Sequence, residues 1–335
     1  MVLTLLALAC SGDNDKLDYE QDAIAGVKQY VGDELTELAA SGRALVAAAP
    51  AADADGWSAA TDADAVLEVK SHWRTTRIHY ERVEGAIAVL FPDLDVSTDE
   101  RYDGFIATTP DENLFDDLVV TGVHGVERIV WSDSIPDYVT AFESKLDFYR
   151  PAAFPTDEAS ADEFATLLTQ RLADDLAEMG TSFEPLALDA AAAYDGVVGS
   201  MLEQVEKVSL AQTGEEESRY AQHTAADMRA NLEGGREIYA QFSEWVRDTD
   251  GGEAVDDAVH AGFDRMQAAL DAIPGESIPP VPATWNPDAP SEADLATPYG
   301  QLWSVVQIES DPAADGSLVS EMAAAADLVG IEVAL

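Results

Sequence analysis

Basic residues are scarce in this sequence of 335 residues, because only 18 are Lys or Arg whereas 65 are Asp or Glu. The formal net charge is therefore −47. A surface that binds nucleic acid needs clustered Lys and Arg to displace counterions from the phosphates, so we expect no nucleic-acid partner. Acidic residues spread along a chain keep its surface solvated in salt, and they also attract cations toward a metal site.

Cysteine and long apolar segments are scarce as well. Cys10 is the only cysteine, so it cannot form an internal disulfide, and the apolar run before it is far shorter than the ~20 residues that span a bilayer. That run, followed by polar residues, is typical of a bacterial lipoprotein signal, and the alternative is an ordinary secretory leader. We predict that residues 1–10 are a signal remnant, that 11–17 are a tether, and that a lipid on Cys10 anchors the chain in the cell envelope.

Strand-like alternation is also missing, and apolar residues instead recur every three or four positions. This pattern predicts an all-α fold built as two up-and-down, four-helix-type bundles. The prolines of 151–160 suggest a boundary between an N-terminal bundle, 18–150, and a C-terminal bundle, 151–335. Seven prolines within 274–298 predict an extended insertion there.

The expected helices are 18–49, 62–90, 111–131, 136–149, 161–179, 184–210, 220–249, 257–272, 292–308 with a break near Pro298, and 317–329. The segment 95–110 is expected to be an ordered connection.

Two pairs of polar residues suggest a metal site. His124 and Glu127 are three residues apart on an expected helix, so both can reach one ion. The alternative is a core histidine hydrogen-bonded to Glu127. Glu81 and Glu84 have the same spacing, and carboxylates so placed in a bundle suit iron, manganese, calcium or zinc. The alternative is that they form ion pairs with neighbouring arginines on a solvated face. Asp95, Asp99 and Asp103 in the segment that follows could add an oxygen ligand.

A third pair, His223 and Asp227, lies four residues apart near the start of another expected helix. The alternative is that His223 and Asp227 form an ion pair on the surface. The sequence contains no H-E-x-x-H, G-x-S-x-G, Walker-type or G-x-G-x-x-G motif, so it gives no signal of catalysis.

Three ordered segments resemble the imelysin-like family. The family's G-x-H-x-x-E motif with a following aromatic falls on 122–131, and its W-x-x-x-R-x-x-Y-E-x-x-E pattern falls on 73–84. A third block, E-x-R-Y-x-x-H-T with a later A-N-L-E-G, falls on 217–234. This block is most similar to the EfeO/EfeM branch, in the form that has the imelysin domain only.

The resemblance implies two helical bundles with a cleft between them and a metal ion bound beside that cleft. The implied ligands are Glu81, Glu84, Asp99, His124 and Glu127, and the implied cleft residues are Tyr220, His223, Asp227, Trp73 and Arg77. The implied cargo is a divalent or ferric ion, with iron first and zinc or calcium as alternatives. The implied partner is a membrane permease of an iron uptake system.

These features predict an envelope-anchored, non-catalytic protein that captures iron or a similar cation for uptake. A first alternative is an imelysin-type metallopeptidase, in which the same ion activates water and Glu127 or Glu84 is the general base. A second alternative is a polysaccharide-binding envelope protein with Trp57, Trp245 and Trp285 along its cleft.

Overall fold

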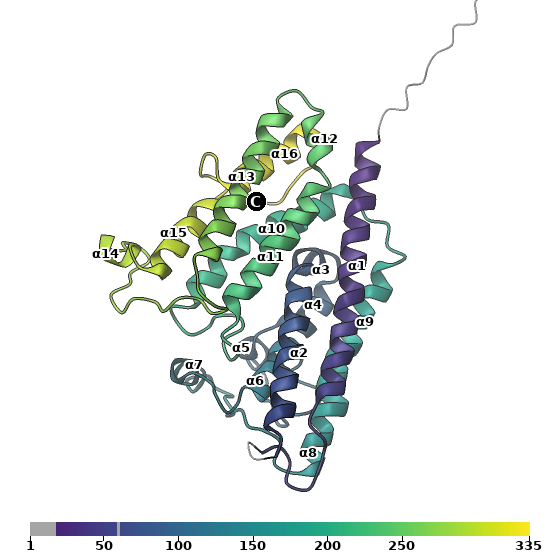
Figure 1. Cartoon of the computed structure of the whole chain (residues 1–335), viewed down its shortest axis with the longest axis vertical. Coiled ribbons are helices and arrows are strands. Elements are labelled where there is room, and N and C mark those ends of the chain that lie inside the picture. Colours follow the sequence, from purple (N-terminus) through teal and green to yellow (C-terminus); the bar gives the residue numbers. More distant parts are fainter. Residues whose placement is uncertain (1–17, 59–60) are drawn as a thin grey trace, which may run out of the picture.

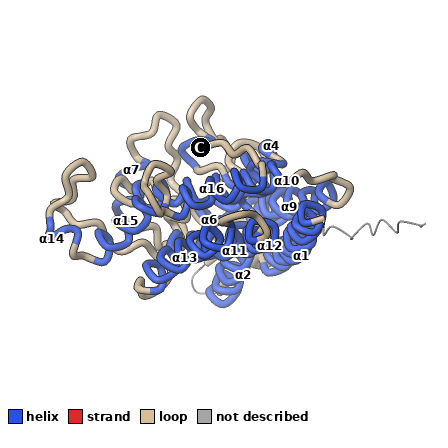
Figure 2. Tube along the Cα trace, turned by 90° about the horizontal axis from the view of Figure 1, so that it is seen from above, coloured by secondary structure: helices blue, strands red, loops and turns tan. Residues whose placement is uncertain are grey.

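The computed structural model describes residues 18–58 and 61–335, and all regular structure in these residues is helical (Figure 2). The predicted all-α class is therefore confirmed. The grouping into two four-helix-type bundles and the boundary at 151–160 stay predictions. The predicted signal, tether and lipidated Cys10 lie outside the described residues. Among the described residues, no helix combines the length and the apolar character needed to cross a bilayer.

The longest helix, α1 (Tyr19–Ala48), runs beside α2 (Ala63–Glu81) and α9 (Thr169–Phe183) (Figure 1). The carboxylate of Asp18 caps α1 by accepting a hydrogen bond from the backbone N–H of Gln21 at 3.2 Å. Before α9 come α8 (Glu158–Glu163) and a π-helical turn, η1 (Phe164–Leu168). Although α9 follows the predicted boundary, it packs against α1.

Short helices connect α2 to α8 along the chain. They are α3 (Glu84–Leu90), α4 (Pro92–Asp99), α5 (Tyr102–Phe105), α6 (Gly122–Val130) and α7 (Asp137–Glu143).

The remaining helices form the other side of the molecule. They are α10 (Ala190–Leu210), α11 (Thr224–Ala240), α12 (Ser243–Arg247), α13 (Gly252–Asp271), α14 (Glu292–Leu295), α15 (Pro298–Glu309) and α16 (Leu318–Val329). Of these, α10 packs against α3 and α11 packs against α2, whereas α13, α15 and α16 lie farther from α1 (Figure 1).

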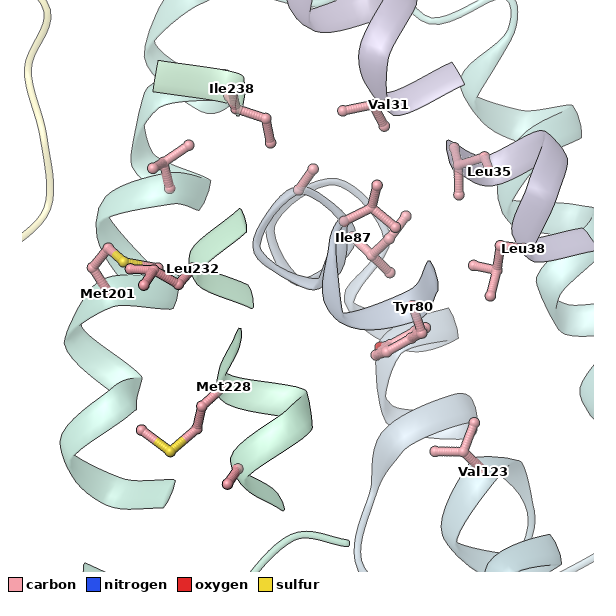
Figure 3. Packing of buried hydrophobic residues seen from close by; sticks show 14 of the residues in the cluster. Val31, Leu35, Leu38, Tyr80, Ile87, Val123, Met201, Met228, Leu232 and Ile238 are labelled. Carbon is pink, nitrogen blue, oxygen red and sulfur yellow. The ribbon is translucent and has the colours of Figure 1, made fainter. Parts of the chain in front are cut away.

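One apolar core joins the two sides. Val31 and Leu35 of α1 lie opposite Ile87 of α3, and Met201 of α10 lies beside Leu232 of α11 (Figure 3). These side chains are at most 1% exposed. Burying such side chains is the main favourable contribution to folding, so this core holds the surrounding helices in fixed positions.

The predicted helix over 62–90 is wrong as one element, because it breaks after Glu81 and resumes at Glu84. The second piece, α3, turns to lie directly on α10. A Cβ on Gly85 would lie 2.3 Å from the carbonyl oxygen of Gly196, so only glycine permits this approach. Spacing alone could not show that the chain turns here.

The predicted helix over 111–131 is also wrong in its first half, because α6 begins only at Gly122. Gly122 has φ of +70°, a left-handed conformation that ends any helix before it and favours glycine. The predicted connection over 95–110 contains the later part of α4 and all of α5, and the predicted helix over 220–249 is divided into α11 and α12.

Candidate metal site

Charged side chains gather where α2, α3, α4 and α6 meet the segment between α10 and α11. We call this group the acidic centre. It consists of the carboxylates of Glu81, Glu84, Asp99 and Glu217, the imidazole of His124, and the cationic groups of Arg77 and Lys207. Each of these side chains is at most 10% exposed. Buried charges cost free energy unless they are paired, so the contacts within the centre decide what it can bind.

Gly122 positions the histidine. A Cβ on Gly122 would lie 2.1 Å from the carbonyl oxygen of Thr98, so glycine lets the start of α6 touch the end of α4. The hydroxyl of Thr121 donates a hydrogen bond to the carbonyl oxygen of Ser97 at 3.0 Å and fixes the same contact. As a result His124, on the first turn of α6, faces Asp99 at the end of α4.

The two ring nitrogens of His124 have different surroundings. Nδ1 lies 2.8 Å from Oε2 of Glu127, whose other oxygen accepts hydrogen bonds from the backbone N–H groups of Tyr220 at 2.9 Å and Ala221 at 2.7 Å. A carboxylate held this way accepts a hydrogen bond from the N–H of Nδ1, which leaves the lone pair on Nε2. Nε2 is buried without a hydrogen-bond partner and lies 3.3 Å from Oδ1 of Asp99.

Arg77 of α2 has no exposed surface and holds several carboxylates together. Its guanidinium contacts Glu81 and Asp99 closely, and it lies 2.6 Å from Oε1 of Glu217. Its Nε lies 3.6 Å from Oδ2 of Asp227. This one side chain therefore joins α2, α4, α11 and the segment before α11.

Lys207 of α10 is a second buried cation. Its Nζ lies 2.7 Å from Oε2 of Glu217 and 3.1 Å from one oxygen each of Glu81 and Glu84. Asn231 of α11 donates to the same two glutamates, at 2.7 Å and 2.5 Å respectively. Glu81 and Glu84 thus accept hydrogen bonds from side chains of both α10 and α11.

The environment changes the proton affinity of these carboxyls in opposite directions. Burial raises the pKa of Glu81 and that of Asp99 well above the usual range of a carboxyl, although Arg77 opposes the shift. For Glu217, burial acts in the same direction, but Lys207 and Arg77 outweigh it and lower the pKa of the Glu217 carboxyl. Glu217 is therefore held ionised more strongly than Glu81 or Asp99.

Among the residues that the structure describes, two sets of side chains have ligand atoms close enough to share one ion. Asp99, His124 and Glu217 form the first set, and Glu81, Glu84, Asp99 and Glu217 form the second; within each set the atoms lie within 4.8 Å of one another. The first set fits a metal ion because its imidazole nitrogen is buried and unpartnered. One imidazole with two carboxylates suits iron, manganese or zinc.

Of the predicted cleft residues, Arg77 belongs to the acidic centre, and the others lie around it rather than in either set. His223 Nδ1 lies 2.8 Å from Oδ1 of Asp227, and the ring of His223 meets the ring of Trp73 edge-on at 5.7 Å. The hydroxyl of Tyr220 donates to Glu143 at short range. These contacts fix the segment that carries Glu217.

Two openings lead from the surface toward the centre. Their volumes are about 200 and 190 Å³, and Arg101 and Glu217 line both of them. Asp95 lines the first opening and Glu203 the second, and burial raises the pKa of each carboxyl to about 7. An approaching cation would therefore meet acidic groups before it reaches His124.

A family model described as imelysin, peptidase family M75, matches residues 28–301. The chain belongs to the imelysin family. The match includes every residue of the acidic centre, and it confirms the resemblance seen in the sequence motifs.

Curated relatives of this imelysin-family chain carry the name iron uptake system component EfeO. The protein from Yersinia pseudotuberculosis serotype I (strain IP32953) is 29% identical over 215 residues, which is 64% of this chain and 44% of the relative. The protein from Escherichia coli (strain K12) is 26% identical over 232 residues, which is 69% of this chain and 49% of the relative. The chain thus spans about half the length of the curated relatives that it matches.

A crystal structure of an imelysin-like protein from Psychrobacter arcticum 273-4 shares the fold. The two structures superpose with a TM-score of 0.56 over 93% of this chain and 98% of that chain, at 12% sequence identity. At this identity the likeness concerns the fold alone.

The sequence analysis of this imelysin-family chain missed two members of the acidic centre. Glu217 opens the third motif block, so a signal for it was present, but that block suggested only Tyr220, His223 and Asp227 as cleft residues. Lys207 carried no signal in the sequence. The predicted ligand Glu127 lies behind the imidazole and outside both ligand sets.

Proposed function

We propose that this chain captures a metal cation, iron first, through Asp99, His124 and Glu217. The observation that supports this most is the buried Nε2 of His124, which has no hydrogen-bond partner and lies 3.3 Å from a carboxylate oxygen of Asp99. A buried nitrogen lone pair without a partner is costly, and an ion would satisfy it.

The names of the relatives support iron as the cargo. Proteins named iron uptake system component EfeO match this chain over most of the described residues. We therefore infer that the chain delivers its ion to a membrane permease of such a system and works in the cell envelope, anchored by a lipid on Cys10. The ligands also suit zinc, whereas calcium prefers oxygen ligands alone and is the less suitable ion.

The contacts of the glutamates favour capture over peptide hydrolysis. A general base needs an oxygen that can accept a proton from water. Both oxygens of Glu127 already accept hydrogen bonds, and both oxygens of Glu84 contact Lys207. Neither glutamate therefore has a free oxygen that could accept a proton from water.

The indoles considered for polysaccharide binding contact different partners. Trp57 packs on Phe164, and Trp285 packs on Tyr299. Trp57 is only 5% exposed, so it offers little surface to a sugar.

The test compares two histidine variants of the full chain. His124→Ala removes the proposed nitrogen ligand. His260→Ala is the matched control, because His260 also lies near an acid, 3.7 Å from Asp256, but outside the acidic centre. Titration calorimetry with Fe²⁺ under anaerobic conditions, together with elemental analysis, gives affinity and metal content.

We expect His124→Ala to weaken binding by more than ~100-fold, since loss of a partner that only orients a ligand already costs about 10–100-fold. His260→Ala should bind as the unmodified protein does. Equal affinities in the two variants would contradict the assignment of the site.

A further inference from the structure

Lys207 lies where a second cation could otherwise bind. Its ammonium group contacts Glu81, Glu84 and Glu217, which are three of the four members of the second ligand set. These contacts span 2.7–3.1 Å, which is within the range of N–H···O hydrogen bonds.

The two ligand sets overlap, because Asp99 and Glu217 belong to both. The two sets differ in the contacts of the residues that they do not share. The first set contains the unpartnered Nε2 of His124, whereas the second contains no nitrogen ligand and is already filled by the ammonium of Lys207.

We propose that Lys207 is an internal cation that fills the Glu81–Glu84 half of the acidic centre, so that the chain takes up one metal ion instead of two. This proposal rests on the proposed function, because it assigns the bound ion to the half of the centre that contains His124. Lys207 thereby sets the number of ions and keeps the bound ion close to the opening that Asp99 lines.

Charge balance supports this role. Metal binding requires ionised ligands, and with all four carboxyls ionised the two fixed cations leave two negative charges, which matches one divalent ion. A second ion would have to displace Lys207, and its ammonium would then lose three partners in a place where the side chain is only 7% exposed. Displacement of a buried, paired charge is strongly unfavourable. The lysine stem tethers the ammonium, so it does not dissociate as a free ion does.

The test counts the ions bound by variants of the full chain. Lys207→Met keeps much of the side-chain volume and removes the charge. Lys70→Met is the matched control, because Lys70 is also largely buried and paired, 3.2 Å from Asp133, but lies outside the acidic centre. Titration calorimetry and native mass spectrometry with Mn²⁺ give the stoichiometry, and circular dichroism monitors the fold.

We expect one Mn²⁺ per chain in the unmodified protein and in Lys70→Met, and two in Lys207→Met. One ion in a folded Lys207→Met, or two in the unmodified protein, would overturn the inference while the proposed function stands. If the unmodified protein binds none and Lys207→Met binds one, Lys207 is the internal cation but the proposed function fails. If neither binds Mn²⁺, both are overturned.

A measurement on the unmodified protein decides the case if Lys207→Met does not fold. Acetylation by acetic anhydride, read by mass spectrometry, reports the accessibility of each lysine. Lys207 should stay protected both without and with Mn²⁺, while the exposed Lys145 is modified in both states. Modification of Lys207 on loading would show that the ion displaces it and would overturn the inference.

Discussion

Replacing Glu127 by glutamine should weaken metal binding without unfolding the protein. Glu127 receives hydrogen bonds from the backbone N–H groups of Tyr220 and Ala221 through Oε1, and its Oε2 lies 2.8 Å from Nδ1 of His124. A glutamine can accept the two backbone bonds through its amide oxygen. Its NH₂ group would then face Nδ1, so the ring proton would move to Nε2 and occupy the nitrogen that faces Asp99.

The size of this effect follows from the lost contact. A hydrogen bond to a charged group contributes about 1.5–3 kcal/mol. Since 1.4 kcal/mol corresponds to a tenfold change in affinity, the expected loss is about 10–100-fold. The same range is typical for the loss of a group that orients a metal-bound histidine.

Two measurements check this reasoning. Titration calorimetry with Fe²⁺ or Zn²⁺ gives the affinity, and the ¹⁵N chemical shifts of the His124 ring without metal give its tautomer. The control is Glu34→Gln, because Glu34 makes the same kind of contact, 2.7 Å from Nδ1 of His79, outside the acidic centre. Equal affinity in the two variants, or a proton that stays on Nδ1 in Glu127→Gln, would refute the reasoning.

Two further predictions concern stability. Gly122→Ala should lower the free energy of unfolding in urea by at least ~2 kcal/mol, because a left-handed alanine costs about 1–2 kcal/mol and its Cβ would lie 2.1 Å from the Thr98 carbonyl oxygen. Gly199→Ala is the control, since a Cβ there meets nothing within 4 Å, and it should stabilise α10 by about 0.5–1 kcal/mol; the same loss in both variants would contradict the prediction. Asp95→Asn should be more stable than the unmodified protein at pH 8 by about 1–2 kcal/mol, after allowance for solvent screening, because burial raises the pKa of Asp95 to about 7. The folded carboxyl keeps its proton where the unfolded one has lost it, so the stability of the unmodified protein falls as the pH rises from about 4 to about 7; a difference that is the same at pH 5 and pH 8 in urea titrations would refute this.

Periodicity predicted the longest helix, α1, correctly and failed where single glycines control the backbone. The extent of α1 follows from the recurring apolar residues and the cap at Asp18. The late start of α6 depends on the left-handed conformation of Gly122, and the turn before α3 depends on the contact between Gly85 and Gly196. Such approaches depend on segments far away in the sequence, so the spacing of apolar residues carries no information about them.

The candidate site was predictable only in part for a similar reason. Spacing placed His124 and Glu127 on one face of a helix, and the structure confirms that their side chains meet. The spacing could not show that Glu127 contacts Nδ1 of the ring and lies outside both ligand sets. Nor could it show that Glu217, far along the chain, shares a ligand set with His124. The pairing of Lys207 with Glu81 spans 126 positions, and no local pattern predicts such a contact.

The three proposed ligands come from three separate stretches of the chain: the end of α4, the first turn of α6 and the segment before α11. An ion held by all three would act as a reversible cross-link in a chain whose single cysteine leaves it no internal disulfide. At an ion concentration 100 times the dissociation constant, such binding adds about 2.7 kcal/mol to the free energy of unfolding. The protein would then resist proteases best while it carries its cargo, and it would become easiest to degrade once the ion has been delivered.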